Sequence, residues 1–92
     1  MTSEYEITMI DFSYVDLLKN GKIIENGFKE LYIENRILYA KMENSYLIFD
    51  TKTGESYSFY VEQFIKNGGE IEKLMSPSNF HSNYWGWRIF FT

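Results

Sequence analysis

Histidine, the side chain that most readily transfers protons near neutral pH, occurs once in this 92-residue sequence, at His81. One histidine without any cysteine cannot supply the ligands of an ordinary zinc site. Neighbouring carboxylates occur, for example Glu70 with Glu72 and Asp11 with Asp16. Such pairs are common on acidic surfaces, and acid catalysis needs one carboxyl group held in an apolar pocket. We therefore expect no catalytic residue and no metal site.

Two polar segments have a superficial likeness to phosphate-handling motifs. "DTKTGE", residues 50–55, contains the residue types of an aspartyl-phosphate motif in a different order, and it is better explained as a polar hairpin tip. "KNGGE", residues 66–70, is better explained as the end of a helix. No Walker, dinucleotide-binding or HExxH pattern occurs. We expect no cofactor and no enzymatic activity.

Composition limits the partners that this chain would bind. Thirteen acidic and nine basic residues give a net charge of −4, which disfavours direct binding to nucleic acid and favours a basic protein partner. The absence of cysteine suits a reducing cytosol. The N-terminal "MTSEYEIT" lacks the features of a signal peptide, and no apolar run reaches the length of about 20 residues that crosses a bilayer. These features predict a cytoplasmic protein that does not bind membranes.

Apolar periodicity predicts strands over most of the chain. Residues 28–34, 37–42, 46–50 and 55–59 alternate, with tight turns at 34–36 and at Gly54. After Phe59 the spacing becomes helical, with Ser58 as the expected cap and Gly68 as the stop. Towards the C-terminus we expect a further helical turn at 70–75, a loop at 76–79 and a strand at 84–91. Towards the N-terminus we expect strands at 5–10 and 22–26. Residues 11–21 between them are predicted as a helix, and the alternative for this segment is a strand that enters a hairpin at Asn20-Gly21.

These elements predict one globular domain, residues 1–92, of the α+β class. We expect a single antiparallel sheet of about five to six strands arranged as a meander, with one or two short helices packed on one face. The side chains expected in its core are Leu31, Ile33, Leu47, Phe49, Phe64, Ile65, Trp85 and Trp87.

Tyrosine occurs once on each of the four central strands, and Tyr32 lies between Glu30 and Glu34 on one strand face. A face that alternates tyrosine with glutamate is too polar for a core, so it is either an ordinary solvent face or a protein-binding face. Tyrosine is enriched at interfaces, and adjacent carboxylates favour a partner rich in arginine or lysine. In the strand predicted for 84–91, the face opposite the two tryptophans combines aromatic and basic side chains. The predicted partner-binding residues are Glu30, Tyr32, Glu34, Tyr39, Tyr84, Arg88 and Phe90.

The segment "LYIENRILYAKMENSYLIFDTKTGESYSF", the short helix after it and the tail "YWGWRIFF" together give the chain a recognisable outline. In size, acidity and α+β organisation it resembles the small immunity proteins of bacteriocin and contact-dependent inhibition systems. The resemblance implies a protein that binds its toxin tightly and occludes a basic nuclease surface. It implies no catalytic residue.

Three other hypotheses stay open. A phage-encoded inhibitor of a host defence nuclease, of the anti-CRISPR or DNA-mimic kind, would use a stripe of carboxylates at Glu25, Glu30, Glu34 and Glu43. A homodimeric accessory subunit would bury the aromatic surface against a second copy. An enzyme or small-ligand domain would line a pocket with aromatic rings. The chain is accordingly expected to be a monomer or a homodimer.

Overall fold

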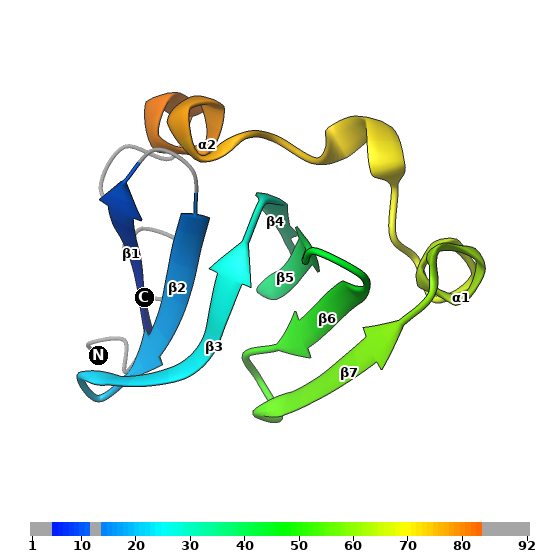
Figure 1. Ribbon diagram of the computed structural model, residues 1–92. Coiled ribbons are helices and arrows are strands. Elements are labelled where there is room, and N and C mark those ends of the chain that lie inside the picture. The colour runs from blue at the N-terminus through cyan, green and yellow to red at the C-terminus, as the bar shows by residue number, and fades with distance from the viewer. Residues whose placement is uncertain (1–4, 12–13, 84–92) are drawn as a thin grey trace.

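Two antiparallel sheets form the body of the protein in the computed structural model, which describes residues 5–11 and 14–83 (Figure 1). The first sheet has the order β1-β2-β3 and the second has the order β4-β5-β6-β7. The strands are β1 (Tyr5–Asp11), β2 (Tyr14–Lys19), β3 (Lys22–Phe28), β4 (Glu30–Glu34), β5 (Ile37–Lys41), β6 (Tyr46–Asp50) and β7 (Glu55–Phe59). The helices are α1 (Val61–Lys66), the 3-10 helix η1 (Ile71–Lys73) and α2 (Pro77–Asn83).

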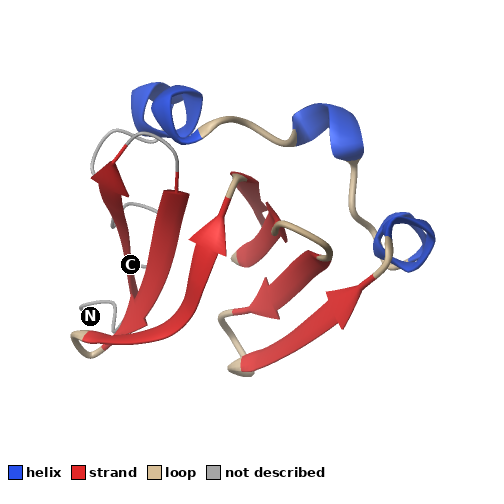
Figure 2. Cartoon of the chain, viewed as in Figure 1, coloured by secondary structure: helices blue, strands red, loops and turns tan. Residues whose placement is uncertain are grey.

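The prediction of a single sheet of five to six strands is therefore wrong, although the α+β class and the antiparallel pairing are confirmed. The chain changes sheet at Lys29, the one residue between β3 and β4. This change lets the apolar sides of both sheets face each other across a shared core. In Figure 2 the strands of the first sheet lie beside those of the second, and the helices lie outside both.

The main core lies between the two sheets. In β1, β2, β4, β5 and β6 the residues that face this core alternate along the strand. Leu31, Ile33, Leu47 and Phe49 lie in this core as predicted, whereas the prediction that Ile65 lies in the core is wrong, because Ile65 is 53% exposed. Its remaining buried members are Tyr5, Ile7, Val15, Leu17, Phe28, Leu38, Ala40 and Phe80.

Residues 14–19 form β2, so the helix predicted for 11–21 is wrong and its hairpin alternative is right. Val15 and Leu17 are both fully buried, with the period of two that a strand requires. Asn20 and Gly21 follow with φ values of 52° and 82°, the left-handed pair that a two-residue hairpin needs. This Asn-Gly turn and the alternating apolar residues outweigh the helical propensity of the segment.

The four-stranded meander follows the prediction closely. Asn35 and Arg36, with φ values of 54° and 64°, turn β4 into β5. Gly54, with a φ of 78°, ends the turn between β6 and β7. Asparagine and glycine tolerate positive φ, and they occupy two of these three positions. Arg36 is the third position, and it adopts positive φ without being either residue.

The helical part differs from the prediction at both ends. Ser58 belongs to β7, and α1 starts after Tyr60 without a side-chain cap. Residues 77–83, predicted in part as a loop, form α2. Pro77 occupies the first turn, where proline is tolerated, and the Asn79 N–H donates to Ser76 Oγ at 3.3 Å.

No described helix is long and apolar enough to span a membrane. The strand predicted for residues 84–91, with the core tryptophans Trp85 and Trp87, lies outside the described residues.

Candidate protein-binding surface

The tyrosine face of the second sheet is buried, so the prediction that it is open to solvent is wrong. Tyr32 is 2% exposed and Tyr39 is 8% exposed. Their rings stack with centroids 4.6 Å apart and planes within 10° of parallel. Phe64 of α1 meets the Tyr39 ring edge-on at 6.1 Å. Buried in this way, Tyr32 and Tyr39 offer no open surface to a partner.

A second apolar cluster explains why tyrosines can be buried here. Segment 61–75 crosses the outer face of the sheet, and the Glu70 main-chain N–H donates to the Tyr32 hydroxyl at 2.9 Å. The polar tip of Tyr32 is therefore satisfied while its ring packs. Burial raises the pKa of both Tyr32 and Tyr39 above the ordinary tyrosine value. The partly buried members of this cluster are Ile37, Tyr46, Ile48, Phe59, Leu74 and Met75.

The predicted carboxylates Glu30 and Glu34 lie at the margins of this covered face. Glu34 forms an ion pair with Lys73 at 2.7 Å, and Lys73 also contacts Glu70 at 2.9 Å. The hydrogen bond that Lys73 donates to Glu34, followed by the one that it donates to Glu70, raises the pKa of Lys73 above its ordinary value. Glu30 is half-buried and lies opposite Lys41 in the strand register. Each of the two predicted carboxylates thus has a lysine as its ion-pair partner or cross-strand neighbour.

This arrangement bears on the carboxylate stripe of a DNA mimic. Glu25 lies on the first sheet, where its Oε2 atom accepts a hydrogen bond from Ser56 Oγ at 3.3 Å. Glu30 and Glu34 lie on the second sheet beside lysines. A mimic of a phosphate backbone needs evenly spaced, unpaired negative charge. Because Glu25, Glu30 and Glu34 lie on two sheets and have hydrogen-bond partners or lysine neighbours, they do not form such a stripe. This favours a protein-binding surface that is not made of these carboxylates.

The remaining predicted partner residues, Tyr84, Arg88 and Phe90, lie outside the described residues.

A different surface, on β7 and the start of α1, carries exposed large apolar side chains. We call Tyr57, Tyr60, Val61 and Ile65 the β7–α1 patch; their exposed fractions are 49%, 77%, 40% and 53%. All four come from one nine-residue stretch of the chain. Large apolar side chains with this exposure forgo the free energy that burial would contribute, so their concentration on one short stretch of chain makes it a candidate contact surface.

Aromatic rings and a carboxylate are combined within the patch. The Tyr57 ring stacks on Phe59 with a centroid distance of 6.2 Å, and the Tyr57 hydroxyl donates to Glu55 Oε2 at 3.0 Å. This hydrogen bond, together with the negative charge of Glu55, raises the pKa of Tyr57. The carboxylate of Glu55 thus lies beside the Tyr57 hydroxyl at this surface, a combination that suits contact with a basic partner.

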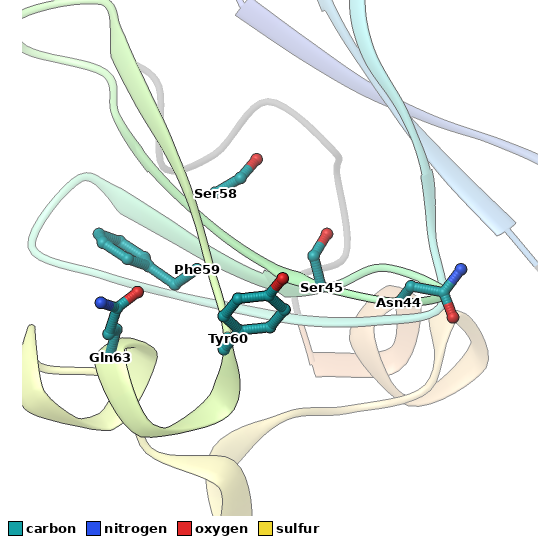
Figure 3. Close-up of a pocket in the computed structure, with 6 residues that line it drawn as sticks. All are labelled: Asn44, Ser45, Ser58, Phe59, Tyr60 and Gln63. Atoms are coloured by element: carbon teal, nitrogen blue, oxygen red, sulfur yellow. The ribbon is translucent and has the colours of Figure 1, made fainter.

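Two open hollows adjoin the patch, and Phe59 lines both of them. The larger, about 360 Å³, is lined by uncharged side chains, and Figure 3 shows Tyr60 at its front. The smaller, about 180 Å³, lies between β7 and the end of α1. Both are open to solvent rather than enclosed, so they fit projecting side chains of a partner better than a sequestered substrate. The larger hollow is lined by Asn44, Ser45, Ser58, Phe59, Tyr60 and Gln63, and the smaller by Ile37, Ile48, Asp50, Tyr57, Phe59 and Asn67.

Within residues 5–11 and 14–83, no group of three or more histidine, cysteine or carboxylate side chains is placed to hold a metal ion.

The sequence contained a signal for this surface that the prediction did not use. The last strand of a meander lies at the edge of its sheet unless another segment pairs with it. Residues 55–59 were predicted as the last of four consecutive strands, so Tyr57 and the residues that follow it were candidates for exposure. The predicted partner-binding residues lie instead on the strands at 28–34 and 37–42 and on the strand predicted for 84–91.

Comparisons of the chain with models of protein families, with curated proteins and with solved structures found no match.

Proposed function

We propose that this protein is a small acidic inhibitor that binds another protein, and that it acts as an immunity protein which neutralises a nuclease toxin by occluding it. The observation that carries the proposal is the β7–α1 patch, four large apolar side chains held in solvent on one short stretch of chain. A side chain such as Tyr60, 77% exposed, offers a large rigid area with a polar tip. Residues of this kind are frequent among those that dominate binding energy.

Charge supports a basic partner. The chain carries a net charge of −4, and Glu55 and Glu62 are close in sequence to the residues of the patch. A nuclease binds phosphate through lysine and arginine, so its active surface is basic. Opposite charges steer two such proteins together and raise the association rate, an effect that falls with rising salt. Occlusion of this kind requires no catalytic group on the inhibitor.

The test begins with capture of partners by the tagged full chain from the cells that encode it, followed by identification by mass spectrometry. The captured protein is then purified and tested for nuclease activity with and without an equimolar amount of the chain. We expect a basic nuclease whose activity is abolished at a one-to-one ratio. A captured enzyme whose activity is unchanged by the chain contradicts the proposal.

A matched pair of charge variants tests the location of the surface. Glu62 and Glu72 are both exposed, the first on α1 and the second on η1. Glu62→Lys should slow association with the nuclease and reduce its dependence on salt, whereas Glu72→Lys should change both much less. Equal effects of the two substitutions would mean that overall charge, and not this surface, steers the partner.

A further inference from the structure

The second sheet has two edge strands, and described residues cover only one of them. Along β4, Leu31 exchanges two main-chain hydrogen bonds with Met75, at 2.9 and 3.0 Å. At the other edge, β7 pairs with β6 and with no other strand that the structure describes (Figure 1). A strand with one unpaired side presents main-chain N–H and C=O groups that can bind another strand.

The hydrogen-bond alternation shows which main-chain groups of β6 point toward β7. The Met42 N–H donates to the Ser45 carbonyl at 2.8 Å, which makes this the hydrogen-bonded pair that closes the turn between β5 and β6. Hydrogen-bonded and non-hydrogen-bonded pairs alternate along antiparallel strands. Counting along the register, Leu47 directs its main chain toward β5 and Ile48 directs its main chain toward β7.

The same alternation continues into β7. Ile48 lies opposite Tyr57, so this pair exchanges the bonds between β6 and β7. The flanking residues Ser56 and Ser58 therefore direct their N–H and C=O groups away from β6. Both serines are exposed and carry small side chains, so a second strand can approach their main chain closely.

β7 has few of the devices that usually protect an edge strand, the charge of Glu55 at its start being one. It contains no proline and no lysine, and its five residue pairs with β6 run without a bulge. Proteins commonly place such features on exposed edges to prevent unwanted pairing. The opposite edge of the same sheet is covered, whereas β7 has neither proline, lysine nor bulge. This contrast points to β7 as an edge that binds another strand.

The two faces of β7 differ in chemistry. On the side of the first sheet, Ser56 contacts the carboxylate of Glu25. On the other side, Tyr57 and Phe59 line the smaller hollow, with Glu55 at the start of the strand. Side chains of an added strand alternate between the same two faces.

We propose that an extended basic segment of the partner adds to the second sheet along β7, bound by the main chain of Ser56 and Ser58. The segment carries lysine or arginine on the side of Glu25 and apolar residues on the side of Tyr57 and Phe59. Lys52 in the adjoining turn is outweighed by Glu25 and Glu55. This inference rests on the proposed function and specifies the kind of segment by which the partner is held.

The test uses a phage-displayed library of random dodecapeptides, selected on the immobilised full chain. Ser58→Pro removes an outward N–H without removing a bond to β6, a position where an edge strand accepts proline. Ser58→Ala is the matched control, because it removes the hydroxyl and keeps the N–H. We expect enriched peptides with lysine or arginine at alternate positions that bind Ser58→Ala within about twofold of the wild type and bind Ser58→Pro at least about tenfold more weakly.

A second measurement does not depend on the fold of the proline variant. Saturating the wild-type chain with an enriched peptide should slow hydrogen exchange of the Ser56 and Ser58 amides by at least about tenfold, because both become hydrogen-bonded. The inference is overturned if no peptide is enriched, if the enriched peptides lack basic residues, or if neither amide becomes protected. Nuclease inhibition tests the proposed function separately: inhibition without protected amides rejects this inference alone, and protected amides without inhibition reject the proposed function.

Discussion

Phe64 is the buried residue of α1, and its replacement by alanine should destabilise the protein strongly. Its ring lies 4.8 Å from the ring of Tyr46 and 6.1 Å from that of Tyr39. Phe64→Ala leaves a cavity between the helix and the sheet, because the paired strands below cannot move to fill it. Truncation of a buried phenylalanine costs about 3–5 kcal/mol. Domains of this size are stable by only about 5–15 kcal/mol, so the loss is a large fraction of the total.

Urea denaturation followed by circular dichroism measures this loss. The neighbouring Ile65 is 53% exposed, so Ile65→Ala serves as the control and should change stability by no more than about 0.5 kcal/mol. For a small domain, a loss of 3 kcal/mol or more should lower the urea midpoint by about 1 M or more. If Phe64→Ala leaves too little folded protein, Phe64→Leu should give a smaller loss in the same direction.

Equal costs for Phe64→Ala and Ile65→Ala would refute this reasoning. That result would mean that α1 does not cover the tyrosine face, and the assignment of Tyr32 and Tyr39 to the interior would fail with it.

Three further predictions concern packing, a buried carboxylate and alkaline pH. Gly69→Ala should lower the free energy of unfolding, measured by chemical denaturation, by about 1–3 kcal/mol, because the added methyl group would overlap the buried Phe64 ring. An unchanged denaturation midpoint would show that the ring can move and would contradict this prediction. Asp16→Ala should cost about 1–3 kcal/mol by the same assay, since it removes the acceptor of the Gly27 N–H at 3.3 Å, and Asp16→Asn, which keeps an acceptor oxygen, should cost less. Burial raises the pKa of Tyr39 above its ordinary 10.0, so the folded state favours the neutral phenol and stability should fall as pH rises above 10. Spectrophotometric titration of the wild type and Tyr39→Phe should show one late-titrating tyrosine fewer in the variant, and identical curves would contradict its burial.

Local signals accounted for the part of the fold that was predicted correctly. Alternation in residues 28–50 set which side chains face the core, and the turns at Asn35 and Gly54 lie where the sequence offers residues that tolerate positive φ. Leu31 and Phe49 could be placed in the core from this pattern alone. Such features depend on neighbours a few residues apart, which is why one sequence suffices to identify them.

The change of sheet at Lys29 had no comparable signal. Ile23 and Ile24 are adjacent rather than alternating, and nothing in residues 22–34 indicates that the second strand joins a different sheet. The packing of β4 with residues of β1 and β2 in one core requires the change. The burial of Tyr32 is likewise a long-range effect, because the group that satisfies its hydroxyl is the main chain of Glu70, 38 residues later. Polar strand faces can be covered by distant segments, and periodicity does not report this.

Tyr32 and Tyr39, which were predicted to contact a partner, are buried for the same reason. Segment 61–75 covers the central strands β4 and β5 and leaves the end of the meander exposed. The expectation of a basic protein partner comes from the net charge of the chain and stays a prediction, whereas the location of the candidate surface could be proposed only from the packing.

Binding of the captured nuclease to two serine variants, measured by isothermal titration calorimetry, tests the central claim most directly. Ile65, in the β7–α1 patch, and Ile23, on β3, are exposed to nearly the same extent, 53% and 55%. Ile65→Ser should weaken binding by at least about tenfold, and Ile23→Ser should change it by less than about twofold. Equal affinities for the two variants, or a larger loss for Ile23→Ser, would contradict the proposal that the β7–α1 patch binds the partner.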